Sequence, residues 1–132
     1  MMRNNEVRIL VDTSVWIEYL RNNPEITGII DTELSNNNIY TTGPVITELL
    51  QGVKTENELK LLSDHIDALI YLECGINHWK KAGQISFKLR KSGLKIPVTD
   101  VIIATVAIEN GAFVYTLDNH FKHIPDVRLY NF

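Results

Sequence analysis

Four carboxylate residues stand beside apolar runs in separate parts of this sequence: Asp12 after the first run, Glu48 in the second quarter, Asp100 before the most apolar stretch, and Asp118 after the last run. Two carboxylates about 4 Å apart repel by about 1 kcal/mol in water and by about 4 kcal/mol at an effective dielectric constant of about 20. Where four of them converge, either their pKa values rise or a cation neutralises them. Oxygen ligands favour Mg²⁺ or Mn²⁺ over Zn²⁺ for that cation. Such a centre suits metal-dependent hydrolysis of a phosphodiester bond.

Each acid also has a purely structural explanation. Asp12 can cap a helix, and Asp100 complements the dipole of a helix's first turn. Asp118 suits a turn, and Glu48 can be a solvated helix residue. The setting of Asp100 favours a site, because residues 101–107 are so apolar that their helix must be buried. A carboxylate at the edge of a buried helix requires a partner.

Other side chains near these acids have possible roles in the same site. Ser14 and Thr116 are predicted to orient the carboxylates through their hydroxyl groups, with helix capping as the alternative for Ser14. His120 and His123 form an i, i+3 pair without further ligands, so surface or packing roles are expected for both. The alternative for His120 is an approach to the substrate, because it lies close to Asp118 in the sequence.

Basic residues gather in the second half of the chain, at Lys80 and Lys81 and again across residues 88–95. On a long helix and the loop after it, they could meet a phosphate backbone near Asp100. A solvated helix face explains them equally well. The larger aromatic residues are expected in the core rather than in base-stacking positions: Trp16, Trp79, Phe87 and Phe121.

Short apolar runs alternate with helical periodicity along the whole chain. Strands are predicted at residues 7–11, 39–42, 70–72 and 112–116, with a possible last strand at 127–130. Helices are predicted at residues 13–21, 24–34, 44–52, 56–69, 77–91 and 100–110, and a short turn or helix at 118–123. The expected N-terminal caps are Thr13 or Ser14, Asn77 and Thr99, and the expected helix ends include Gly52, Gly93 and Gly111.

This alternation predicts an α/β fold with a mainly parallel sheet of four to five strands sandwiched by helices, because parallel neighbours require crossover connections. In such sheets, ligands bind beyond the carboxyl ends of the strands. Asp12 directly follows the first predicted strand and Asp118 lies two residues after the fourth. Asp100 opens a helix expected to begin at the same edge, and Glu48 reaches inward from the helix after the second strand.

The composition is that of a globular protein, with 45% apolar and 22% charged residues, and predicts one domain, residues 1–132. The formal charge of −3 becomes +1 without the four candidate ligands, so it excludes no partner. Cys74 is the single cysteine, which favours a reducing compartment and a cytoplasmic location. A secretory signal and a bilayer-spanning stretch are not expected, and no membrane is predicted as a partner.

The chain resembles PIN-domain ribonucleases, in particular the small VapC-type toxins of prokaryotic toxin–antitoxin pairs. The resemblance rests on four short motifs in a fixed order: Val-Asp12-Thr-Ser-x-Trp, Glu48-Leu-x-x-Gly, Asp100-x-x-Ile-Ala and Thr116-x-Asp118-x-x-Phe. In similar proteins these acids bind Mg²⁺ or Mn²⁺ and activate water for RNA cleavage. The resemblance thus implies a catalytic and metal-binding role for Asp12, Glu48, Asp100 and Asp118, with Ser14 and Thr116 in support.

The resemblance also implies partners. These are an RNA substrate such as tRNA or rRNA, a second copy in a homodimer, and a cognate VapB-like antitoxin that inserts an arginine among the carboxylates. Residues 16–20 and the second helix are the expected contact surfaces, with core packing as the alternative. The competing function is a non-hydrolytic, degenerate PIN-like module that binds metal or protein. Phosphatase chemistry of the haloacid dehalogenase type fits poorly, because it requires an aspartate where Ser14 stands.

Overall fold

The first apolar run forms β1 (Ile9–Val11), whose three residues are fully buried in this computed structural model. The structure describes residues 7–131, so residues 1–6 and 132 of the predicted domain lie outside the described residues. The other strands are β2 (Ile39–Thr42), β3 (Ile70–Leu72) and β4 (Phe113–Tyr115). Together they form one parallel sheet in the order β3-β2-β1-β4. The predicted parallel sheet is therefore confirmed.

The predicted last strand at residues 127–130 is reduced to a single bridge between Val114 and Leu129. The amide of Val114 donates to the carbonyl of Arg128, and the amide of Tyr130 donates to the carbonyl of Val114. Only this one residue of β4 presents its backbone groups to the final segment, so no further ladder forms there.

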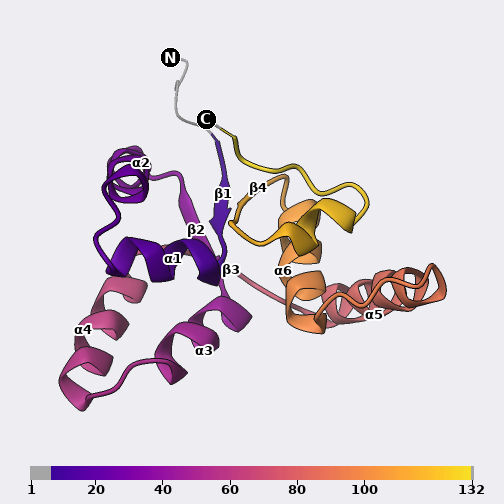
Figure 1. The fold of residues 1–132 in the computed structure, drawn as a ribbon, viewed down its shortest axis with the longest axis horizontal. Coiled ribbons are helices and arrows are strands. Elements are labelled where there is room, and N and C mark those ends of the chain that lie inside the picture. Colours follow the sequence, from indigo (N-terminus) through magenta and orange to yellow (C-terminus); the bar gives the residue numbers. More distant parts are fainter. Residues whose placement is uncertain (1–6, 132) are drawn as a thin grey trace.

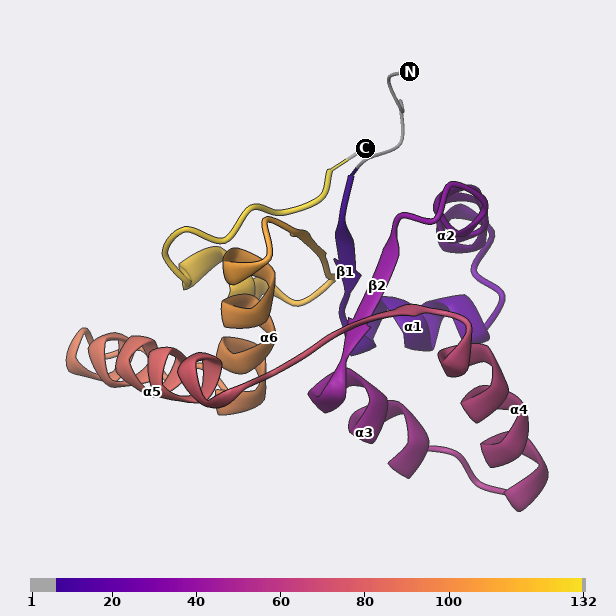
Figure 2. The same cartoon turned by 180° about the vertical axis from the view of Figure 1, so that it is seen from behind.

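Within residues 7–131, six α-helices and one 3₁₀-helix connect and follow the strands. Their bounds are α1 (Thr13–Leu20), α2 (Pro24–Ser35), α3 (Gly43–Gln51), α4 (Glu56–Asp67), α5 (Ile76–Lys91), α6 (Val98–Glu109) and η1 (Asn119–His123). The steps from β1 to β2 to β3 carry α1–α4, whereas the return from β3 to β4 runs in the opposite direction and carries α5 and α6. Right-handed crossovers then place the two groups of helices on opposite faces. Figures 1 and 2 show α1–α4 on one side of the strands and α5 and α6 on the other.

Helices α5 and α6 begin one and two residues before their predicted starts, at Ile76 and Val98. The N-cap of α5 is Gly75, whose amide donates to His78 Nδ1 at 2.9 Å, so the predicted cap Asn77 already lies inside the helix. The N-cap of α6 is Pro97, because its carbonyl accepts the first helical hydrogen bonds and Thr99 is helical. In both cases a backbone acceptor upstream starts the helix before a capping side chain is reached. Gly93 and Gly111 end these helices as predicted, at φ angles of 84° and 63°.

The core is built around α6, the most apolar helix. Ile103 and Val106 are fully buried within it, and α6 packs against α5, β4 and η1. The predicted burial of this helix is confirmed, and so is the core position expected for Trp16 and Phe121, which are 7% and 0% exposed. Within residues 7–131, no helix has the length and apolar character needed to cross a bilayer.

The expectation for the other two aromatic residues is wrong. Trp79 and Phe87 on α5 are 49% and 63% exposed. The buried residues of α5 are Ala82 and Leu89. Because these two residues form only a narrow buried strip on α5, the side chains of Trp79 and Phe87 remain largely in solvent.

Candidate active site

The candidate site lies at the carboxyl edge of the sheet, between β1 and β4. Chain connections leave β1 toward β2 on one side, while β4 is added on the other side, so the strand order reverses at this point. Ligands of open α/β sheets bind in the crevice at such a reversal. Asp12 follows β1 directly, and its amide donates to the carbonyl of Tyr115 at 2.9 Å, which joins the ends of the two strands.

Asp12 is 3% exposed and stands at the N-cap of α1, in place of the predicted Thr13 or Ser14. Its carboxylate makes no capping hydrogen bond. Instead, the hydroxyl groups of Ser14 and Thr116 each donate to Asp12 Oδ2 at 2.8 Å. The side chain is thus held by two hydroxyl groups rather than used to cap the helix.

The same two hydroxyl groups also hold the loop that follows β4. Thr116 Oγ1 accepts from the amide of Asp118 at 2.9 Å, and Ser14 Oγ accepts from the amide of Leu117 at 3.0 Å. Each hydroxyl therefore connects the carboxylate of Asp12 to the backbone that carries Asp118. Residues about 100 positions apart along the chain form one hydrogen-bonded unit.

Glu48 lies on α3 and is half-buried, not a solvated helix residue. The hydroxyl of Thr13 donates to Glu48 Oε1 at 2.8 Å. Since Thr13 directly follows Asp12, this bond turns the glutamate toward the same edge of the sheet.

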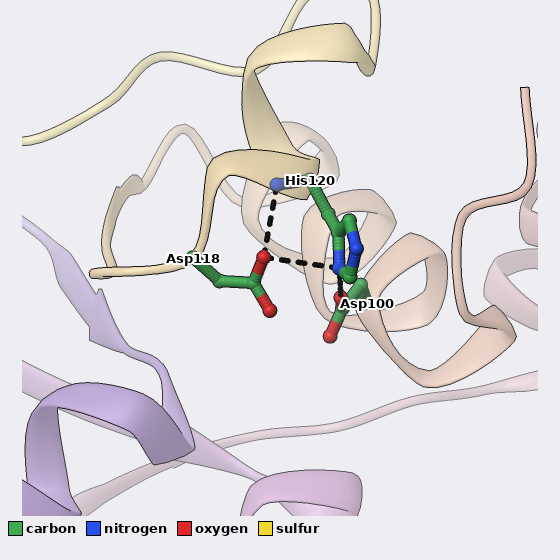
Figure 3. A group of neighbouring side chains, drawn as sticks. All are labelled: Asp100, Asp118 and His120. Carbon is green, nitrogen blue, oxygen red and sulfur yellow. Dashed lines mark hydrogen bonds and ion pairs between the residues drawn. The ribbon is translucent and has the colours of Figure 1, made fainter.

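Asp100, Asp118 and His120 form a tight group, shown in Figure 3. His120 Nδ1 lies 3.0 Å from Asp100 Oδ2 and 3.0 Å from Asp118 Oδ1. The amide of His120 also donates to Asp118 Oδ1 at 2.9 Å, so this carboxylate caps η1 as well as facing the site. The three side chains offer ligand atoms that all lie within 4.8 Å of one another. Asp12 and Glu48 are outside this set.

The contacts of His120 with Asp100 and Asp118 go beyond the expected surface or packing role and favour the alternative of a position beside the substrate. Its ring contacts two carboxylates that come from different elements, α6 and the loop after β4. The sequence offers one signal for this role, its position two residues after Asp118. The decisive contact with Asp100 depends on how α6 packs against η1.

The charges of these groups are coupled. Burial raises the pKa of Asp100, the hydrogen bond from His120 opposes this effect, and the negative charges of Asp12 and Asp118 raise it further. The hydrogen bond to Asp100 raises the pKa of His120, and the charge of Asp118 adds to the effect. Three of the four predicted acids thus lie close enough to act on one another, while Glu48 is linked to them through Thr13.

This fold and site define a PIN domain. The family model described as PIN domain matches residues 9–127, so the chain belongs to the PIN-domain family. Ribonuclease VapC4 of Mycobacterium tuberculosis is 30% identical over 129 residues, which cover 95% of this chain and 97% of that protein. VapC ribonuclease Mb1587 of Mycobacterium bovis is 29% identical over 125 residues, which cover 90% and 92%. The predicted family is confirmed.

Solved structures show the same fold. A chain of VapBC2 from Rickettsia felis, bound to a promoter DNA fragment, superposes with a TM-score of 0.83 at 22% identity, covering 96% of this chain and 99% of that chain. A chain of DNA-bound VapBC from Salmonella typhimurium gives 0.82 at 25% identity, covering 94% and 97%. The architecture is therefore shared over nearly the whole chain.

Proposed function

We propose that this protein is a metal-dependent endoribonuclease, the growth-inhibiting toxin of a toxin–antitoxin pair, that cleaves structured RNA such as tRNA or rRNA. The observation that carries the proposal is the convergence of Asp12, Asp100 and Asp118 at the point of strand reversal, in a relative of VapC ribonucleases. We assign Glu48 to the same site through its bond to Thr13.

The donor set fits a hard divalent cation, Mg²⁺ or Mn²⁺. All four assigned acids supply carboxylate oxygens, which these ions prefer. The raised pKa of Asp100 has burial and two neighbouring negative charges among its causes, and a cation would relieve that repulsion. In the structure, the ring of His120 contacts both Asp100 and Asp118, and it is the one basic group facing them among the described residues.

A divalent cation bound there would supply positive charge that favours ionisation of water and offsets charge on the phosphate. The chain's own residues would hold the acids in place. Ser14 and Thr116 fix the carboxylate of Asp12, whose two hydrogen bonds leave Oδ1 free of these donors. The hydroxyl of Thr13 fixes Glu48. His120 can give or take a proton at Nδ1 beside Asp100 and Asp118.

The test is cleavage of purified cellular RNA with Mg²⁺ or Mn²⁺, with EDTA as the metal-free arm. Asp12→Asn and Asp100→Asn are each expected to reduce cleavage at least about 100-fold, because each removes a charged ligand. Asp67→Asn, at the exposed end of α4, is the charge-matched control and should cleave normally. Cleavage that persists in both site variants would come from a contaminating nuclease, and the proposal would fall.

The alternative is a non-hydrolytic PIN-like module that binds metal or protein. It predicts that the protein binds Mn²⁺ without cleaving any RNA. A degenerate PIN domain would normally have lost some of these acids, and all four are present in this sequence, which favours hydrolysis. Sequencing of the new 5′ ends would identify the RNA that is cut.

We further propose a VapB-like antitoxin, a homodimer and a cytoplasmic location, as the relatives suggest. An apolar groove of about 290 Å³ lies between α1, α2, α3 and α4 and supports the proposed antitoxin contact. Trp16, Tyr19, Leu20 and Leu34 line it, which agrees with the surfaces expected from the sequence.

The antitoxin proposal is tested by co-purification with the product of the neighbouring reading frame. Leu20 is 47% exposed, so Leu20→Lys should leave the fold intact and abolish co-purification. Ile76→Lys on α5, at 67% exposed, is the control and should co-purify normally. Equal co-purification of both variants would place the antitoxin on another surface.

A further inference from the structure

One segment of this acidic protein is strongly basic. Residues 76–97, which comprise α5 and the following loop, contain six lysine or arginine residues and no aspartate or glutamate. We call this segment the basic arm. The rest of the chain contains seven basic residues against sixteen acidic ones. Such a separation of charge creates a local positive field that attracts polyanions, despite the net charge of −3.

Most of the lysine and arginine side chains on the basic arm can bind an anion without first breaking an ion pair within the protein. Lys81 forms an ion pair with Glu109 at 2.7 Å. The other five are exposed and form no ion pair within residues 7–131: Lys80, Lys88, Arg90, Lys91 and Lys95. A side chain without an internal partner can contact a phosphate without first breaking a bond within the protein.

Exposed aromatic rings lie among these cations. Phe87 and Lys88 border a shallow hollow together with Lys80 and Gly83. A side chain added at Gly83 would meet nothing within 4 Å, so the floor of this hollow is open. Phe87 is 63% exposed, and Lys91 Nζ lies 5.9 Å from the centre of its ring. Trp79, one turn from Gly83, is 49% exposed.

Both ends of the basic arm lie at the edge of the sheet that carries the acids. The arm begins shortly after the carboxyl end of β3, which in a parallel sheet is the same edge as the ends of β1 and β4. It ends at α6, whose first turn carries Asp100. Figures 1 and 2 show α5 extending to one side of the molecule, beyond α6. The helix is about 24 Å long at 1.5 Å per residue, enough to contact several nucleotides.

We propose that the basic arm binds single-stranded segments of the RNA substrate, with its lysine and arginine residues on the phosphates and with Phe87 and Trp79 stacked on bases. Positive charge with interleaved aromatic rings is the combination that binds single strands without sequence preference. The bound strand is held beside Asp100. This inference rests on the proposed ribonuclease function and assigns the surface that holds its substrate.

A second copy of the chain fits this surface less well. In a two-fold symmetric dimer, the same patch meets itself. Two basic arms in contact would bring their cations together with no acidic residue on either arm to offset the repulsion. Charge complementarity therefore favours RNA over self-association.

The experiment measures binding of a fluorescent single-stranded RNA, longer than the about 16 nucleotides of large single-strand sites. All proteins carry Asp12→Asn to prevent cleavage, and anisotropy is followed from 0.05 to about 1 M salt. The slope of the logarithm of the binding constant against the logarithm of the salt concentration reports the number of phosphate contacts. Lys88→Gln/Lys91→Gln is expected to reduce the magnitude of this slope by about 1.4, at about 0.7 for each of two lost contacts. If the curves converge at about 1 M salt, binding at about 0.1 M is about 25-fold weaker.

The matched control is Lys54→Gln/Lys60→Gln, which removes the same charge at exposed positions near and on α4. It should leave the slope unchanged. Phe87→Ala is expected to weaken binding about fivefold or more with an unchanged slope, because it removes stacking rather than charge. Thermal melts of every variant confirm that the fold is intact.

The inference would be overturned if Lys88→Gln/Lys91→Gln had the same salt slope as the parent protein. It would also be overturned if this variant and the control Lys54→Gln/Lys60→Gln lost the same amount of RNA affinity. Light scattering covers the remaining outcome. If Phe87→Ala converts a dimer to a monomer and leaves RNA affinity unchanged, the arm is a self-association surface and the inference is wrong. Failure of the enzyme itself is seen separately, because the protein with Asp12 intact would then cleave no RNA even when the slopes behave as expected.

Discussion

The hydroxyl of Thr116 is expected to stabilise the site by an amount that can be measured. It donates to Asp12 Oδ2 at 2.8 Å and accepts from the amide of Asp118 at 2.9 Å. Thr116→Val keeps the branched shape of the side chain and removes both bonds. It leaves Asp12, which is 3% exposed, with one hydroxyl donor, Ser14.

Hydrogen bonds to charged groups contribute about 1.5–3 kcal/mol, and water cannot fully replace the donor at a carboxylate this buried. We expect Thr116→Val to lower the free energy of unfolding by about 2 kcal/mol. For a domain of this size, the melting temperature should fall by about 8 °C. RNA cleavage should also decrease, because the carboxylate of Asp12 is no longer fixed by both hydroxyl groups.

Thr105→Val is the matched control, since Thr105 is fully buried and donates only to the backbone carbonyl of Val101 at 2.7 Å. Loss of that neutral bond should lower stability by about 1 kcal/mol or less. Urea denaturation of both variants, at neutral pH and without metal, measures the two differences. In the Asp12→Asn background, the effect of Thr116→Val should shrink by about 1 kcal/mol, because the acceptor is then neutral.

A Thr116→Val variant no less stable than Thr105→Val would refute this reasoning. The reasoning would also be refuted if Thr116→Val lowered the free energy of unfolding by the same amount in the parent protein and in the Asp12→Asn background. Either result would mean that the hydroxyl serves the packing of the loop after β4 rather than the carboxylate.

Three further predictions concern charge and packing. Burial and the hydrogen bond to Glu33 raise the pKa of Tyr130 to about 12. The contribution of Tyr130 to the free energy of unfolding should therefore be fully present below pH about 10, the pKa in the unfolded chain, and be lost as the pH rises toward 12. In urea denaturation at several pH values, Tyr130→Phe should lose less stability at alkaline pH than the parent. The pKa of Asp100 is raised in the folded protein, so its charge destabilises the metal-free fold at neutral pH. Asp100→Asn should therefore melt higher than the parent without metal, yet gain less from added Mn²⁺; a lower melting temperature would contradict this. Ile103→Ala, at a fully buried position of α6, should lower stability by about 2–5 kcal/mol in urea, and by clearly more than Ile108→Ala, which is partly exposed.

The order of the elements could be predicted because it depends on neighbouring residues. The fully buried run of β1 and the helical period of α6 each bury a continuous apolar surface that the local sequence displays. The left-handed positions at Gly93 and Gly111 are also local, since only the residue itself determines that φ preference. The possible last strand at residues 127–130 forms only one bridge, between Val114 and Leu129. Its pairing depends on β4, which lies far away in the sequence, so local residues could not predict its extent.

The candidate site was predicted only in part. The sequence indicated the four acids through their positions after apolar runs and through the family resemblance. It did not predict the contact of His120 with Asp100, which joins two elements across the site. It also misplaced Trp79 and Phe87, because helical periodicity does not reveal that α5 buries only a narrow strip.

The amino-acid sequence by itself determined the alternation of strands and helices, the most apolar helix, the family and the residues able to bind a hard cation. Tertiary structure alone decided that Ser14 and Thr116 share one oxygen of Asp12 and that His120 lies between two carboxylates. The reason is physical. Secondary structure follows from interactions over a few residues. The contacts of Thr116 with Asp12 and of His120 with Asp100 instead join positions about 100 and 20 apart, which meet only after the sheet takes the order β3-β2-β1-β4.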